Sequence, residues 1–209
     1  RKTAKSLLTE LHESLEIDED FEAWMTDGIA VDWTFDDRIK SDLIKAEVVA
    51  IPITLIILGI IFGSLVAAFL PLSIGGATLF AAVGMTIWLS NVTDVTVYAT
   101  NIVSLIGIGV SIDYSLFLVN RFREELERGR DVRTATAMCS ATAGKAVFYS
   151  GITVAIGLMG MLFFTNTSLP SLGIGGTIAV SIAMVYSTIV LPAVMSWLGP
   201  RINKWEVPY

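Results

Sequence analysis

The sequence contains very few of the side chains on which soluble enzymes and disulfide-stabilised domains depend. Its 209 residues include one cysteine and one histidine. A single cysteine, Cys139, cannot form an intrachain disulfide, and His12 is interpreted as an ordinary surface residue. No metal-ligand cluster, nucleophile triad or phosphate-binding glycine loop is recognisable. We therefore expect no enzymatic activity, no cofactor and no metal site.

Charge is also scarce, and it is absent from long stretches of the chain. Only 16% of the residues are charged, 54% are hydrophobic and the mean hydropathy is +0.69. A helix of about 17–25 apolar residues can cross the hydrocarbon core of a membrane. The composition therefore predicts an all-α polytopic membrane protein. Five segments are long enough to span: 46–70, 72–89, 97–119, 146–164 and 172–198.

The missing positive charges also predict an orientation. The loops at 90–96 and 165–171 contain no lysine or arginine, whereas the connector at 120–145 and the tail at 199–209 contain several. Short loops rich in lysine and arginine remain cytoplasmic. We therefore expect the connector and the tail to be cytoplasmic and residues 1–45 to be extracytoplasmic. The expected location is the inner (cytoplasmic) membrane, which the chain crosses several times.

The outer segment carries two different apolar patterns. Ala4, Leu7, Leu8, Leu11 and Leu15 follow a helical period, whereas Ile29, Val31, Trp33 and Phe35 alternate with polar or small residues, as in a half-buried strand. One helix and one strand in 45 residues cannot bury both faces. The segment therefore needs a partner, which can be the rest of a larger domain, a second copy or another subunit. We expect a short α+β remnant of a larger extracytoplasmic domain.

The connector between the third and fourth spans is predicted to form an amphipathic helix on the inner membrane surface. Gly129 can end the preceding helix and Asp131 can cap the next one. Val132, Ala135, Met138 and Thr142 then share one face. A solvated charged loop is the alternative interpretation. Cys139 lies in this connector and is expected to be a small core residue.

The third span contains an ionisable residue, Asp113, in the stretch "GIGVSIDYSLFLVNRFREE". A charged carboxylate inside a bilayer costs at least a few kcal/mol, and low dielectric favours the neutral form of any carboxyl group. A proton carrier needs that property. Gly109, one turn earlier, leaves the same face bare, and Tyr114 offers a hydroxyl to a neighbouring group. A purely structural aspartate that bonds a packing partner is the alternative.

The same stretch resembles the fourth-helix signature of the MmpL-type lipid exporters, within the resistance–nodulation–division superfamily. "AEVVAIPITLIILGIIFGSLVAAFLPL", "VTDVTVYATNIVSLIGIGVSIDY" and "LGPRINKW" resemble further segments of that family. The resemblance implies helices two to six of one half-transporter. It also implies that Asp113 and Tyr114 form the proton-relay pair, with Ser150 as a weaker match to a polar residue near that relay.

Much of a complete transporter is missing from the resemblance. A first helix, most of a porter domain and the entire second half have no counterpart here. We therefore expect an excerpt of a longer protein, or a chain that functions with an oligomer mate. No lysine or arginine lies inside the five spans to pair with Asp113. Asp113 is accordingly expected to face an open apolar surface made for a second half.

The function that these features predict is export of lipids or other hydrophobic compounds, driven by the proton-motive force. The expected partners are a hydrophobic substrate, membrane lipids and a second half, with no nucleic acid. Two alternatives remain at this stage. One is a non-transporting membrane sensor similar to sterol-sensing domains, and the other is a proton-coupled accessory subunit of protein export.

The orientation can be tested with single cysteines introduced near the two termini and at Arg128. We expect Arg1 to lie outside the membrane and Tyr209 inside, because the basic connector holds its own side in the cytoplasm. A membrane-impermeant maleimide applied to intact cells should label the position at Arg1 and spare the other two. Labelling of position 128 from outside would contradict the orientation.

Overall fold

The computed structural model describes residues 28–93, 95–164 and 169–203. Within these ranges the chain is helical and contains no strand. The α-helices are α2 (Gly28–Phe62), α3 (Leu65–Leu89), α4 (Val97–Glu127), α5 (Val132–Cys139), α6 (Lys145–Met159), α7 (Leu169–Val185) and α8 (Leu191–Leu198). The connecting elements are the π-helices η1 (Ser140–Gly144) and η3 (Tyr186–Val190) and the 3₁₀-helices η2 (Gly160–Phe163) and η4 (Gly199–Asn203).

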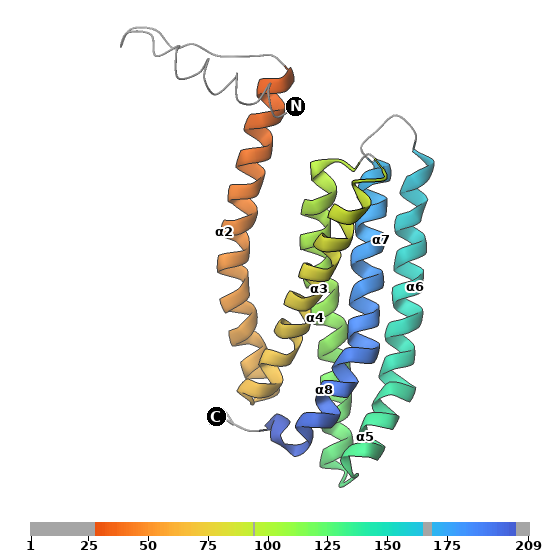
Figure 1. The fold of residues 1–209 in the computed structure, drawn as a ribbon. Helices are drawn as coiled ribbons and strands as arrows, with labels where there is room; N and C mark the ends of the chain where they lie inside the picture. Colours follow the sequence, from red (N-terminus) through yellow and green to blue (C-terminus); the bar gives the residue numbers. More distant parts are fainter. Residues whose placement is uncertain (1–27, 94, 165–168, 204–209) are drawn as a thin grey trace, which may run out of the picture. The chain divides into compact units, whose positions relative to one another are not determined.

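The chain divides into two units, residues 1–49 and 50–209. In the second unit α4 packs against α3 and α7, and α7 also packs against α6. These four helices run alongside one another, and α5 lies at one end of the bundle (Figure 1). We call this end the α5 end. The central position of α4 means that its residues determine how the rest of the bundle is held.

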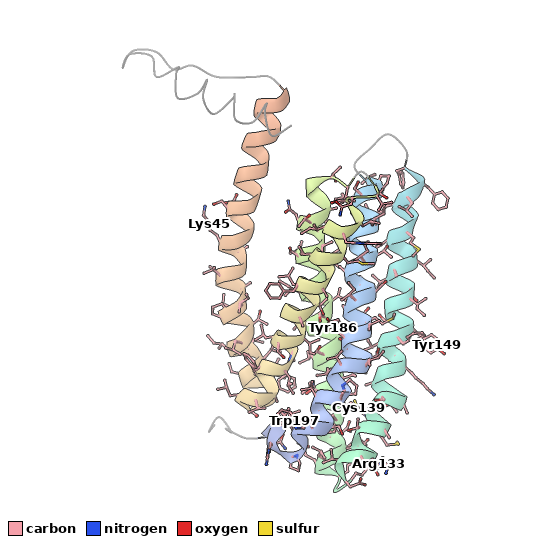
Figure 2. All side chains as sticks on the ribbon, in the orientation of Figure 1. Lys45, Arg133, Cys139, Tyr149, Tyr186 and Trp197 are labelled. Atoms are coloured by element: carbon pink, nitrogen blue, oxygen red, sulfur yellow. The ribbon has the colours of Figure 1, made fainter. Side chains whose placement is uncertain are left out.

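Four helical segments are long and apolar enough to cross a membrane. Two of them join several elements through π-helical turns, so that α5 to η2 and α7 to η4 are each continuous. The four segments are Leu65–Leu89, Ala99–Glu127, Val132–Phe163 and Leu169–Asn203, and α2 adds a shorter apolar stretch, Val48–Phe62. Their outer sides carry many exposed large hydrophobic side chains, and Tyr149 on α6 also points away from the bundle (Figure 2). This architecture is that of a polytopic α-helical membrane protein.

The turn between the first two apolar helices lies earlier than the sequence analysis placed it. The predicted spans 46–70 and 72–89 meet at Pro71, but α2 ends at Phe62 and Pro71 lies inside α3. Gly63 has a φ of 59°, which favours glycine, and Ser64 caps α3 by accepting a hydrogen bond from the backbone of Ala67. The Gly-Ser pair was thus the stop and start signal, and the proline was not.

The predicted strand at 29–36 is wrong. These residues belong to α2, which begins at Gly28 and runs without interruption into the apolar stretch. Extending an existing helix is easier than starting one, whereas a strand needs a neighbouring strand to satisfy its backbone groups. The described residues provide none. The predicted α+β character of the outer segment is therefore not observed, and its apolar stripe at 4–15 lies outside the described residues.

The connector follows its predicted caps, with one change of face. Gly129 ends α4 with a φ of 80°, and the Asp131 carboxylate accepts a hydrogen bond from the backbone of Thr134. Hydrogen bonds from Thr134 hold the pKa of Asp131 below its usual range. Ala135 and Cys139 are buried, whereas Thr142, predicted on the same face, is exposed. The π-helix η1 begins directly after Cys139 and changes the register, so Thr142 leaves that face.

Cys139 is a small core residue, as expected. Its side chain is fully buried, and its thiol donates a hydrogen bond of 3.2 Å to the carbonyl oxygen of Leu118 on α4. The cluster of buried side chains around it includes Phe122, Leu191 and Ile202. Cys139 therefore helps to hold α5 and α8 against α4 at the α5 end.

Close contact between the helices depends on glycines in α7. A Cβ at Gly173 would lie 2.8 Å from the carbonyl oxygen of Leu158, and a Cβ at Gly175 would lie 3.0 Å from that of Ala99. Gly173 thus permits the approach of α6 and Gly175 the approach of α4. Small residues at interfaces let membrane helices pack backbone to backbone. The "GIGG" stretch at 173–176 serves this purpose.

These contacts predict different outcomes for two glycine-to-alanine substitutions. Gly173→Ala should destabilise the bundle by about 1–3 kcal/mol, because rigid backbone atoms would have to move. Gly84→Ala in α3 is the matched control, since a Cβ there has nothing within 4 Å. Unfolding in a detergent titration would measure both. Equal midpoints for Gly173→Ala and Gly84→Ala would contradict the close contact of α6 with α7.

Candidate functional site

Asp113 lies in the middle of α4 with its side chain exposed. Leu105, Gly109 and Phe117 lie on the same side of the helix at intervals of four residues, and all are exposed. We call these four residues the Asp113 stripe. Leu105 and Phe117 are 66% and 51% exposed, which is typical of an outward surface rather than a core. The described helices therefore leave Asp113 exposed.

Gly109 leaves open space beside the carboxyl group. An added Cβ at this position would have no heavy atom within 4 Å. This glycine differs from Gly75 and Gly107, at which a Cβ would touch side chains of neighbouring helices. The Asp113 stripe therefore has a position without a side chain, at which another helix or a file of water molecules could approach the backbone closely.

The Asp113 carboxyl group makes no hydrogen bond or ion pair with any residue that the structure describes. A charged carboxylate in a membrane without a partner is unfavourable by several kcal/mol. Relief must come from a proton, from water or from groups outside the described residues.

The other two predicted residues are not directly joined to Asp113. Tyr114 is half-buried and packs against the core cluster at the α5 end of the bundle, because adjacent helical residues point about 100° apart. Ser150 is exposed on α6, which packs against α7 and not directly on α4. No hydrogen bond links either side chain to Asp113 among the described residues. Asp113 and Tyr114 are therefore neighbours in sequence with different surroundings.

The opposite side of α4 is held by hydroxyl groups that the sequence analysis did not identify. Ser111 and Thr78 on α3 share a hydrogen bond of 2.9 Å, and Ser115 and Ser187 in η3 lie 3.4 Å apart. All four side chains are fully buried. Polar groups in apolar surroundings are stabilised by such pairs. The four-residue spacing of Ser111 and Ser115 could have indicated that both lie on one face of α4. Because that face is buried, Asp113 lies on the outward face.

A buried glutamate anchors the end of α4. The Glu125 side chain is 0% exposed, and its oxygens lie 2.6 Å from Arg121, 3.0 Å from Arg128 and 2.9 Å from Arg130. Glu124, one residue earlier, pairs with Arg121 and Arg128 on the exposed side. The basic residues were predicted as headgroup partners. Three of them instead pair with glutamates, which stabilises the turn that leads into α5.

The chain resembles one known family over nearly its whole length. The model of the MMPL family matches residues 5–207 of this chain. The match includes all the described helices and the Asp113 stripe. Curated relatives at 36–43% identity confirm the likeness over about four fifths of the chain.

Three relatives illustrate the range of names in this group. The mycolic acid-containing lipids exporter MmpL11 of Mycolicibacterium smegmatis is 43% identical over 165 residues, which are 79% of this chain and 17% of that protein. The trehalose monomycolate exporter MmpL3 of Mycobacterium tuberculosis is 36% identical over 169 residues, 81% of this chain and 18% of that protein. The heme uptake protein MmpL11 of M. tuberculosis is 40% identical over 165 residues, 79% and 17%. The chain thus spans under a fifth of the length of each of these relatives.

The buried ion pairs predict a contrast between two neighbouring glutamates. Glu125→Gln should destabilise the protein by about 3–5 kcal/mol, because three arginines would lose a buried counter-charge. Glu124→Gln is the matched control and should have little effect, since exposed ion pairs contribute little. Thermal unfolding in detergent would compare them. A larger loss of stability for Glu124→Gln than for Glu125→Gln would contradict the burial of Glu125.

Proposed function

The chain belongs to the MMPL family, transporters of the resistance–nodulation–division superfamily, and on that premise we propose that it takes part in proton-driven export of lipids or other hydrophobic compounds. The observation that carries the proposal is the unpartnered Asp113 on an exposed apolar stripe. Family membership supports transport rather than enzymatic catalysis. The exporter names of two relatives support a lipid as cargo.

The proton step is assigned to Asp113. A neutral carboxyl group can move within apolar surroundings, whereas a charged one requires water or a donor. Protonation therefore changes what the Asp113 stripe can pack against, and α4 can shift relative to its neighbours. Tyr114, half-buried beside it, is a hydroxyl donor to an approaching carboxylate. The exposed position of Ser150 gives it a smaller role.

The partner of the stripe is a second transporter half or an oligomer mate. Leu105 and Phe117 provide an apolar contact, and Gly109 provides the close approach. An Asp-Tyr pair on the other side would supply the donor that Asp113 lacks among the described residues. A second half would account for the outward position of a carboxyl group whose burial in the membrane is unfavourable in free energy. The outer side of α6 carries exposed hydroxyl side chains, Tyr149, Ser150 and Thr153, but no carboxyl group.

The membrane orientation follows from the α5 end. This end carries Arg128, Arg130 and Arg133, all exposed or partly exposed, whereas the helix ends on the other side carry no lysine or arginine among residues 90–96 and 165–171. We assign the α5 end to the cytoplasmic side of the inner membrane. Protons would then enter from the side opposite α5 and leave toward it.

We propose a broad cargo class, lipids or other hydrophobic compounds, because the relatives are named for different cargoes. Two are named as exporters of lipids and one as a heme uptake protein, and each matches about four fifths of this chain. We assign energy coupling to Asp113 in the described bundle and cargo selection to regions beyond it. Neither the sensor nor the protein-export alternative is favoured by a specific observation on these helices.

Substitution of Asp113 tests the proposal. Asp113→Asn should abolish transport while the protein remains folded, because the amide keeps size and hydrogen bonding but cannot carry the proton. Tyr114→Phe should weaken transport less completely. Glu127→Gln removes a carboxylate at the exposed end of the same helix and is the matched control.

Transport would be measured with the intact transporter in proteoliposomes under an imposed pH gradient, with trehalose monomycolate as the probe lipid. Circular dichroism would verify the helix content of each variant. Full transport by Asp113→Asn would overturn the proton-carrier role. Loss of transport in Glu127→Gln to the same extent would show that the effect is not specific to Asp113.

A further inference from the structure

Arg123 joins three segments of the chain that are distant in sequence. Its Nη1 donates a hydrogen bond of 2.6 Å to the carbonyl oxygen of Phe62, at the end of α2. Its Nε donates one of 2.8 Å to the side-chain oxygen of Asn203 in η4. The guanidinium carbon also lies 5.7 Å from the centre of the Phe62 ring. One side chain on α4 thus holds the end of α2 and the segment after α8.

The contact with Phe62 is strong for reasons of helix geometry. The last carbonyl groups of a helix have no partner inside that helix, and α2 ends here because Gly63 takes a left-handed conformation. A cation at a helix C-terminus is also favoured by the helix dipole. The charged, planar guanidinium group satisfies the carbonyl and stacks on the ring of the same residue.

The other contacts of α2 with the bundle are few. Most side chains of its apolar stretch are exposed, whereas Leu58 and Phe62 are buried and Leu55 is partly buried. The exposed ones are Ile51, Ile53, Ile56, Ile57, Ile60 and Ile61. The residue that Arg123 holds is therefore one of the few points at which the described part of α2 is fastened. Removal of Arg123 would leave mainly apolar contact at that point.

Arg123 differs from the other arginines of "RFREELERGR". Arg128 and Arg130 pair with glutamates of α4 itself, and Arg121 pairs with the same glutamates and with Thr142. Arg123 has no carboxylate among its recorded partners and reaches instead to α2 and η4. Its role is therefore not part of the ion-pair network around Glu125.

Asp113 and Arg123 are on the same uninterrupted helix. Ten residues separate them, which corresponds to about 15 Å along α4. Neither proline nor a π-turn interrupts α4 between them. A displacement of α4 that begins at Asp113 would therefore carry Arg123 with it.

We propose that Arg123 is a positioning residue that couples the movement of α4 to α2, so that protonation at Asp113 displaces the α5 end of α2. This proposal rests on the proposed proton-driven function. The acid-dependent step belongs to Asp113, because α3 carries no titratable side chain and the segment from α7 to α8 carries only Tyr186. The charged groups around the α5 end are the arginines, the paired Glu124 and Glu125, and the exposed Glu127, Asp131 and Lys145.

The test measures two distances in the intact transporter by pulsed electron spin resonance. Cys139 is replaced by alanine, and spin labels are attached to introduced cysteines at exposed positions. The α4 pair has labels at position 120 on α4 and position 149 on α6. The α2 pair has labels at position 57 on α2 and position 149 on α6. Both distances are measured in mildly acidic and mildly alkaline buffer. We expect both to shift with pH in the otherwise unaltered protein.

Arg123→Gln should abolish the shift of the α2 pair and leave the shift of the α4 pair. Arg133→Gln is the matched control, because the guanidinium group of Arg133 on α5 is exposed and makes no hydrogen bond or ion pair with the described residues, and both shifts should persist. Arg123→Lys keeps the charge but cannot bridge two acceptors in one plane, so it should retain a reduced α2 shift. The lysine variant also provides the comparison if Arg123→Gln fails to fold.

The outcomes separate the two proposals. A full α2 shift in Arg123→Gln, or in Arg123→Lys if only that variant folds, would overturn the coupling role of Arg123. An α2 shift lost equally in Arg133→Gln would also overturn it. If the α4 pair does not respond to pH in the unaltered protein, or still responds after Asp113→Asn, the proton-driven function itself is wrong.

Discussion

Polar groups inside an apolar helix bundle must find partners within the protein, and this constraint organises the structure around α4. Without water, an unsatisfied backbone or side-chain group costs several kcal/mol. Ser111 and Ser115 meet hydroxyls of neighbouring helices, and Arg123 satisfies the last carbonyl of α2. Asp113 carries the carboxyl group in the apolar part of α4, and it has no hydrogen-bond or ion-pair partner among the described residues. This lack of a partner is what makes it a functional candidate.

The α5 end shows how the same constraint produces a rigid base. Glu125 is buried only because three arginines surround it, and these arginines follow from α4, its end at Gly129 and the turn after it. Arg123 points to another side of α4 and holds α2 and η4. The charged residues that follow the third predicted span thus stabilise the turn into α5 and also hold α2 and η4 against α4. A helix anchored in this way can move as one piece, with Asp113 at its middle and the anchors at its end.

The features that depend on local chemistry were predictable, and those that depend on distant partners were not. The caps at Gly129 and Asp131 were predicted because each acts through its own backbone. The strand at 29–36 was predicted wrongly, because alternation over eight residues does not show whether a neighbouring strand exists. The turn at Gly63 was missed although its signal was local, and the predicted spans met at Pro71 instead. Pro71 lies inside α3, and membrane-spanning helices tolerate proline because neighbouring groups satisfy the freed backbone.

Composition and charge pattern alone determined that this chain is a helical membrane protein and that Asp113 lies within an apolar span. Hydropathy and charge are assigned residue by residue along the sequence, so these conclusions did not require any knowledge of tertiary contacts. Only the tertiary structure decided that Asp113 faces outward, that Glu125 is buried and that Arg123 reaches Phe62. These features depend on how α4 is rotated and which helix ends meet it. Contacts between residues 61 positions apart are set by packing, and the order of residues does not encode them locally.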